Sequence, residues 1–200
     1  MTQSSAPPEA IIAATQRWVE RAVIGLNLCP FAKGVQSKGQ VHYVVSQADD
    51  APSLLIDLKQ QLQDLHDSDP AQRDTTLLIA PLVFPDFLDF NDFLDLADRL
   101  LRKMRLDSDY QIASFHPQFQ FADAEVDDIS HYTNRAPYPI LHLLREESID
   151  RAVEAFPDAA LIFEKNMETL RALGPAGWQA LDVGPAKGCP AHPVTGDTAP

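Results

Sequence analysis

The chain has 200 residues and a mass of 22.1 kDa, and 45% of its residues are hydrophobic, so it can bury the core of one full-sized domain without a metal or a disulfide. Its formal net charge is -13 and its basic residues are scattered, which disfavours nucleic acid and anionic membranes as partners. The two cysteines lie far apart, residues 1–9 lack the signature of an export signal, and no apolar stretch approaches the roughly 20 residues of a membrane-spanning helix, so we expect a cytoplasmic protein.

The chain divides into one domain with a tail at each end. Residues 1–8 are small, polar and proline-containing, and residues 174–200 are rich in Pro, Gly and Ala without a periodic apolar pattern. Both segments are predicted to be flexible tails. The domain between them spans residues 9–173.

The first half of the domain contains one strand–helix–strand unit. Apolar residues recur at helical spacing over residues 8–27, and Pro30 ends the pattern. Residues 41–45 are typical of a strand, Pro52 opens an amphipathic helix that continues to Leu65, and residues 75–80 form a short β-branched and apolar strand. A right-handed crossover between parallel strands is expected.

A second unit follows, with a helix from Asn91 to Met104 and a strand over residues 110–115. The run 140–144 is predicted to be a fourth strand or a buried extended segment, and helices are expected over residues 148–156 and 158–173. The predicted fold is therefore a single α/β domain. It has a small, mainly parallel sheet of three to four strands with helices packed on it, an extra N-terminal helix and two C-terminal helices.

The segment 116–139 is the most informative part of the sequence. A loop of this length is unusual in a compact domain unless it binds something or is disordered. Its aromatic and proline residues argue against disorder: Phe119, Phe121, Tyr132 and Tyr138 supply anchors. Ligands of parallel α/β sheets bind beyond the carboxyl ends of the strands, where this loop begins. We therefore expect a polar site here.

Cys29 follows the N-terminal helix, which also delivers Asn27. A thiol next to a proline is a candidate nucleophile or ligand, and Asn27 a candidate substrate-binding residue. Free cysteine is, however, among the most buried residue types, and the carboxyl end of a helix raises a thiol pKa. The structural interpretation of Cys29 is therefore favoured unless a histidine or arginine lies beside it.

His116 follows the strand 110–115 directly and precedes Pro117, a position that suits a general acid or base. The alternative is a histidine that hydrogen-bonds a loop carbonyl. The two interpretations have equal support.

Asn134 and Arg135 place a fork of hydrogen-bond donors before a rigid Pro-Tyr-Pro segment, which suits bidentate capture of a carboxylate or phosphate. The alternative is a salt bridge from Arg135 to a nearby acidic residue of the loop. His142 and Arg145 are further candidates for substrate binding. They share a face on a helix but take opposite faces on a strand, so their joint role is open.

A metal site can be assembled from His116, His131, His142 and Asp123 or Asp127, but no compact ligand spacing supports it. Cys189 and His192 supply only two of the usual four zinc ligands, and their spacing is interpreted as incidental. No dinucleotide fingerprint, phosphate loop or nucleophile elbow occurs, and the sequence identifies no cofactor.

Several separate motifs resemble, in the same order, a bacterial family called domain of unknown function 1415. They are Asn27-Leu28-Cys29-Pro30-Phe31-Ala32, Phe90-Asn91-Asp92-Phe93-Leu94, Gln111-Ile112-Ala113-Ser114-Phe115-His116-Pro117, Asn134-Arg135-Ala136-Pro137-Tyr138-Pro139 and Leu141-His142-Leu143-Leu144-Arg145-Glu146. The resemblance covers about residues 10–173. The family carries no assigned activity, so the resemblance implies no catalytic residues.

The leading hypothesis is an enzyme that acts on a small anionic molecule. Arg135, helped by Arg145, holds the anion, His116 moves a proton, and Cys29 is a nucleophile or ligand. The first alternative is a binding or adaptor protein in which the same polar residues fix the loop. The second is a metal-dependent hydrolase.

Overall fold

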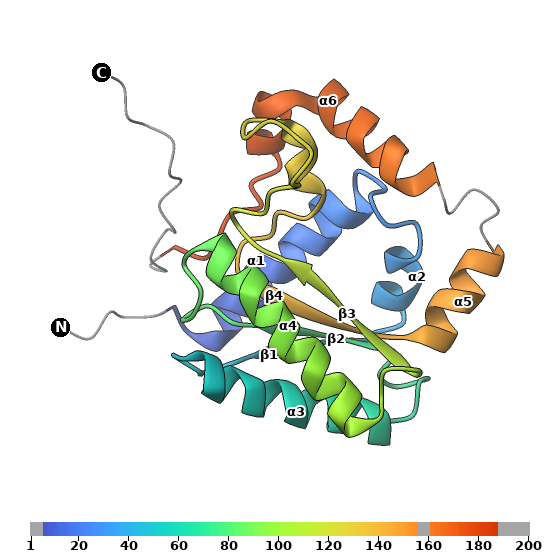
Figure 1. Ribbon diagram of the computed structural model, residues 1–200. Coiled ribbons are helices and arrows are strands. Elements are labelled where there is room, and N and C mark those ends of the chain that lie inside the picture. Colours follow the sequence, from blue (N-terminus) through green and yellow to red (C-terminus); the bar gives the residue numbers. More distant parts are fainter. Residues whose placement is uncertain (1–5, 156–160, 188–200) are drawn as a thin grey trace.

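The structure of the protein is a computed structural model, and it describes residues 6–155 and 161–187 (Figure 1). The helices are α1 (Pro8–Trp18), the π-helical turn η1 (Val19–Ile24), α2 (Ala32–Ser37), α3 (Ala51–Asp67), α4 (Phe87–Met104), the 3-10 helix η2 (Ile129–Thr133), α5 (Glu146–Ala155) and α6 (Ile162–Ala180). The strands are β1 (Val41–Val45), β2 (Thr75–Ile79), β3 (Tyr110–Phe115) and β4 (Ile140–Arg145). Within these described residues, no helix is long and apolar enough to span a membrane.

The four strands form one sheet in the order β1-β2-β4-β3, which confirms the predicted α/β class with three to four strands. β1 and β2 are parallel, but β4 runs antiparallel to both β2 and β3, so the expectation of a mainly parallel sheet was wrong. The connection 116–139 stays at the end of the sheet where β3 leaves it. The chain therefore enters β4 beside that end, with Ile140 paired to Phe115, and β4 must run backwards.

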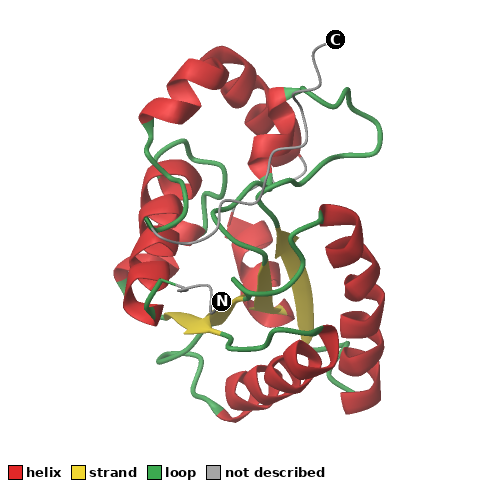
Figure 2. Ribbon diagram, turned by 90° about the vertical axis from the view of Figure 1, so that its left-hand side faces the viewer, coloured by secondary structure: helices red, strands yellow, loops and turns green. Residues whose placement is uncertain are grey.

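Helices cover both faces of the sheet (Figure 2). Alternate residues of β2 point to opposite faces: Leu78 packs in the core beneath α3 and α4, whereas Leu77 and Ile79 pack in the core with α1. β2 is buried on both faces, as expected for an interior strand flanked by helices. The sheet thus lies between two apolar cores.

Helix α4 begins earlier than the sequence pattern indicated. The predicted start was Asn91, but Asp86 caps the helix, and its side chain accepts hydrogen bonds from the backbone N–H groups of Leu88, at 2.7 Å, and Asp89, at 3.4 Å. An aspartate at this position satisfies donors that the first turn leaves unpaired. The helix therefore begins directly after Asp86, ahead of the apolar pattern from which the start at Asn91 was predicted.

The N-terminal helical segment is also more complex than one predicted helix over residues 8–27. The α-helix passes into the π-helical turn η1, and the turn that follows ends at Asn27, whose φ is 56°. A left-handed residue of this kind is typical of a helix carboxyl end, and asparagine tolerates it better than most residues.

The ordered domain extends beyond the predicted boundary at residue 173. Helix α6 kinks at Gly174, with a φ of 68°, and continues to Ala180. Beyond it, the Arg17 Nε donates to the carbonyl oxygen of Asp182 at 2.7 Å, and the N–H of Ala186 donates to the Tyr138 hydroxyl at 2.7 Å. Residues 174–187 therefore belong to the packed structure, while Cys189 and His192 lie outside the described residues.

Candidate functional site

The loop 116–139 is held closed at its base. The His116 N–H donates to the carbonyl oxygen of Asn134 at 3.2 Å, and the Asn134 side-chain amide lies 3.4 Å from the Ser114 carbonyl oxygen. Inside the loop, Asp128 caps η2 by accepting from the Ser130 N–H at 2.8 Å. The two ends of the loop are therefore joined, and His116 lies beside Asn134, the residue before Arg135.

His116 is fully buried, and both of its ring nitrogens serve backbone groups. Nδ1 accepts from the Gln118 N–H at 3.0 Å, so Nε2 carries the proton and donates to the Phe84 carbonyl oxygen at 2.9 Å. The rings of Phe87 and Phe90 lie 5.5 and 5.3 Å from its own. The acid–base role of His116 remains a prediction, and these contacts favour a role in fixing the loop.

His131 is held in the same way. Its Nδ1 accepts from the Phe121 N–H at 3.1 Å, and its Nε2 bonds the Glu125 carbonyl oxygen at 2.7 Å. A metal needs the lone pair that His116 and His131 give to backbone donors. Among residues 6–155 and 161–187, no group of three or more His, Cys, Asp or Glu side chains is arranged to hold a metal ion.

Arg135 presents a positioned guanidinium group. Its Nε donates to the Phe119 carbonyl oxygen at 3.1 Å, and its Cζ lies 4.4 Å from the centre of the Tyr132 ring, on which the Trp178 ring packs edge-on at 4.9 Å. Within the described part of the chain, no acidic side chain pairs with Arg135; Asp128 of the loop pairs instead with Arg171, at 3.1 Å. The contacts of the described residues therefore include no salt bridge between Arg135 and an acidic residue of the loop.

Arg145 lies at the other end of the sheet. It pairs with Tyr110, whereas His116 follows Phe115, so the length of β3, roughly 17 Å at 3.3 Å per residue, separates the two ends. Its side chain is 8% exposed. The structure therefore does not bring Arg145 to Arg135.

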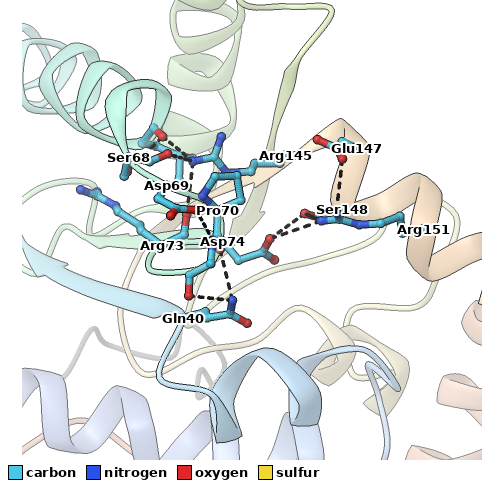
Figure 3. A network of polar contacts seen from close by, with 12 residues as sticks. Gln40, Ser68, Asp69, Pro70, Arg73, Asp74, Arg145, Glu147, Ser148 and Arg151 are labelled. Carbon is cyan, nitrogen blue, oxygen red and sulfur yellow. Dashed lines mark hydrogen bonds and ion pairs between the residues drawn. The ribbon is translucent and has the colours of Figure 1, made fainter.

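The Arg145 guanidinium fastens the carboxyl end of α3 to the sheet (Figure 3). Nη2 donates to the carbonyl oxygens of Leu65, Ser68 and Arg73 at 2.5, 3.0 and 3.2 Å, and Nη1 donates to the Tyr110 hydroxyl at 2.9 Å. These acceptors compensate a buried cation without a carboxylate, because the carboxyl end of a helix is the negative end of its dipole.

His142 lies in the middle of β4, on the face toward α1. Its Nε2 lies 2.7 Å from the Thr75 hydroxyl, and the Phe115 ring centre lies 6.1 Å from its own. Burial lowers the pKa of His142 from 6.5 to about 4, because the charged form loses its hydration. At neutral pH this imidazole is uncharged.

Cys29 and Asn27 occupy the turn after η1, away from the loop in sequence and held by their own contacts. The N–H groups of Leu28 and Cys29 both donate to the Val23 carbonyl oxygen, and the Cys29 thiol is half-buried and unpaired with another cysteine. Asn27 lines a cleft of about 300 Å³ between this turn and the first half of α6. The two residues remain predicted site residues without a histidine or arginine shown to contact them.

The sequence pattern does not reveal the roles of three contributors to these arrangements. Trp178 lies in a segment predicted to be a tail, and Thr75 lies in a predicted strand. Tyr132 was identified as a loop anchor, but its position beneath Arg135 was not. Arg135 lies beyond the end of η2 at Thr133, so no helical spacing in the sequence indicated that its guanidinium would lie against Tyr132.

The chain matches a protein family described as protein of unknown function (DUF1415), over residues 10–180. No curated protein and no solved structure matches it. The matched range contains the loop 116–139, the strands and α6, and it reaches beyond the range of the resemblance seen in the sequence, as does the ordered structure. The chain therefore belongs to the DUF1415 family.

Proposed function

We propose that the protein binds a small anionic molecule at the loop 116–139, with Arg135 as the group that holds the anion. The proposal rests on the hydrogen bonding of the Arg135 guanidinium group. Nε is engaged by the Phe119 carbonyl oxygen, while Nη1 and Nη2 have no hydrogen-bond or ion-pair partner among the described residues.

The surroundings of Arg135 support a prepared receptor. The Phe119 carbonyl oxygen and the Tyr132 ring hold the guanidinium plane from two directions, so little side-chain freedom is lost when an anion binds. Two parallel N–H groups match the two oxygens of a carboxylate or phosphate, and such charge-assisted pairs are stronger than neutral hydrogen bonds.

Binding is proposed in preference to acid–base catalysis at this loop. A general base must have a lone pair available to the substrate, and Nδ1 of His116 already accepts from the Gln118 N–H. The protein's net charge of -13 opposes anions at long range, so a positioned cation such as Arg135 is required for an anion to bind.

The experiment is a thermal-shift series with inorganic phosphate, acetate and citrate on wild type, Arg135→Gln and Arg171→Gln. Arg171→Gln is the matched control, because it also removes one positive charge near this loop, from an exposed arginine that pairs with Asp128. We expect at least one anion to raise the Tm of wild type and of R171Q. In R135Q the affinity falls by about 10- to 100-fold, the value of a charged hydrogen-bond pair.

Two outcomes would contradict the proposal. One is an equal Tm increase in R135Q and wild type, which would place the anion elsewhere. The other is the absence of any anion-dependent increase in wild type. The unliganded Tm of R135Q is compared with that of wild type first, since the variant also loses the bond to Phe119.

A further inference from the structure

One part of the sheet is incompletely covered by helices. β4 is an interior strand, and on the face toward α3 and α4 its residues Leu141, Leu143 and Arg145 are buried. On the face toward α1, Ile140 is buried but His142 and Leu144 are only half-buried. We call the surface formed by His142 and Leu144 the open sheet face.

Two hydrogen bonds fix the proton of the His142 imidazole. The Thr75 hydroxyl donates its single hydrogen to the Leu143 carbonyl oxygen at 2.6 Å, so at 2.7 Å from His142 Nε2 it must accept. Nε2 therefore carries the ring proton. Because the imidazole is neutral at neutral pH, Nδ1 keeps its lone pair.

Nδ1 is open to a ligand. Nδ1 has no hydrogen-bond partner among the described residues. If it were also buried, it would be a buried polar atom without a partner, and Arg145 Nε is the only such side-chain atom in the described part of the chain. Nδ1 of His142 is therefore in contact with solvent. His116 and His131 differ, because their Nδ1 atoms accept backbone N–H groups.

The neighbours of His142 within the sheet are uncharged on this face. Leu77 of β2 and Ala113 of β3 flank it in the sheet register, Leu144 lies two residues along, and Phe115 supplies an aromatic ring at 6.1 Å. Ala113 contributes only a methyl group beside the imidazole. This environment favours an apolar body with one donor and disfavours a charged ligand, since none of these groups compensates a buried charge.

We propose that the open sheet face is a second binding site, which takes an uncharged small molecule with an apolar body and one O–H or N–H group that donates to His142 Nδ1. The site is independent of the Arg135 loop, which recognises an anion. Thr75 is its positioning residue, because its hydroxyl holds the tautomer in which Nδ1 is the acceptor.

The experiment records the imidazole ¹⁵N resonances of the full chain at neutral pH during titration with phenol, with toluene as the matched ligand that lacks a donor. His142→Gln assigns the signal. We expect Nδ1 of His142 to show the shift of an unprotonated nitrogen and to move on addition of phenol but not toluene. Thr75→Ser keeps the hydroxyl and the response. Thr75→Val removes the acceptor of the Nε2 proton, so the proton can move to Nδ1. Phenol binding then weakens by up to about tenfold, the value of the hydrogen bond that a protonated Nδ1 no longer accepts.

Each other result overturns the inference. A protonated Nδ1 in the free protein would refute the assigned tautomer. No response to phenol, or equal responses to phenol and toluene, would refute the role of Nδ1 as acceptor. An unchanged phenol response in T75V would remove Thr75 as the positioning residue. None of these results depends on anion binding at Arg135.

Discussion

Single side chains show how similar residue types take different roles in this protein. His116 and His142 were both predicted site residues from their residue type and position. The first gives both ring nitrogens to backbone groups, and the second gives one to Thr75. The sequence could propose these polar residues as candidates but could not give their partners, because a hydrogen bond such as His116 to Phe84 joins segments far apart in the chain.

The lowered pKa of His142 should make the stability of the protein depend on pH. Its pKa is 6.5 in an unfolded chain and about 4 in the folded protein, so the unfolded state binds the proton more readily and stability falls as the pH drops from 6.5 to 4. The pKa difference corresponds to about 3 kcal/mol. Urea unfolding between pH 7 and 4 should show wild type losing about that much more stability than His142→Gln. Parallel pH profiles for the two proteins would contradict this account.

Removing the Arg145 guanidinium should lower the free energy of unfolding strongly. Arg145→Met leaves the carbonyl oxygens of Ser68 and Arg73 and the Tyr110 hydroxyl without their donor, which costs about 3 kcal/mol or more. The control is Arg151→Met, which removes an exposed guanidinium that pairs with Glu147 at 3.2 Å and lies 4.0 Å from Asp74, and which costs about 0.5 kcal/mol. Urea unfolding measures both, and equal losses would show that the buried guanidinium is not needed.

At the scale of elements, the sequence predicted the strands closely because each is a short apolar or β-branched run between turn residues. It could not predict the direction of β4, since side chains alternate between faces in either direction and only the return path of the loop 116–139 decides it. It also placed the start of α4 too late, because Asn91 is a good cap residue in isolation. The cap is Asp86, which accepts from Leu88.

The start of α4 gives a matched pair of substitutions. Asp86→Ala removes the acceptor of the Leu88 N–H and is expected to lower the free energy of unfolding by about 1 kcal/mol. Asn91→Ala, at an exposed position inside the helix, is expected to change it by about 0.5 kcal/mol or less. Denaturant unfolding of the two variants distinguishes the predicted and observed starts. The reverse order would support a helix that begins at Asn91.

Across the whole molecule, the residues that the sequence assigned to one site lie in separate places in the structure. His116, Asn134 and Arg135 share the loop, His142 lies on the sheet face toward α1, and Arg145 closes the far end of β4. Which segments meet depends on strand order and register, which no local pattern reports. The packing of Trp178 against the loop was missed for the same reason, because a Gly-Pro kink in α6 was interpreted as the start of a tail.

Calorimetric titration of wild type, Arg135→Lys and Arg135→Gln with phosphate, acetate and citrate tests whether Arg135 holds the anion. Lysine keeps the charge but lacks the planar fork and cannot occupy the guanidinium position between Phe119 and Tyr132. We expect wild type to bind one of these anions, R135K to bind it about tenfold more weakly, and R135Q to bind it more weakly still. Equal affinities in the three proteins would show that Arg135 does not hold the anion.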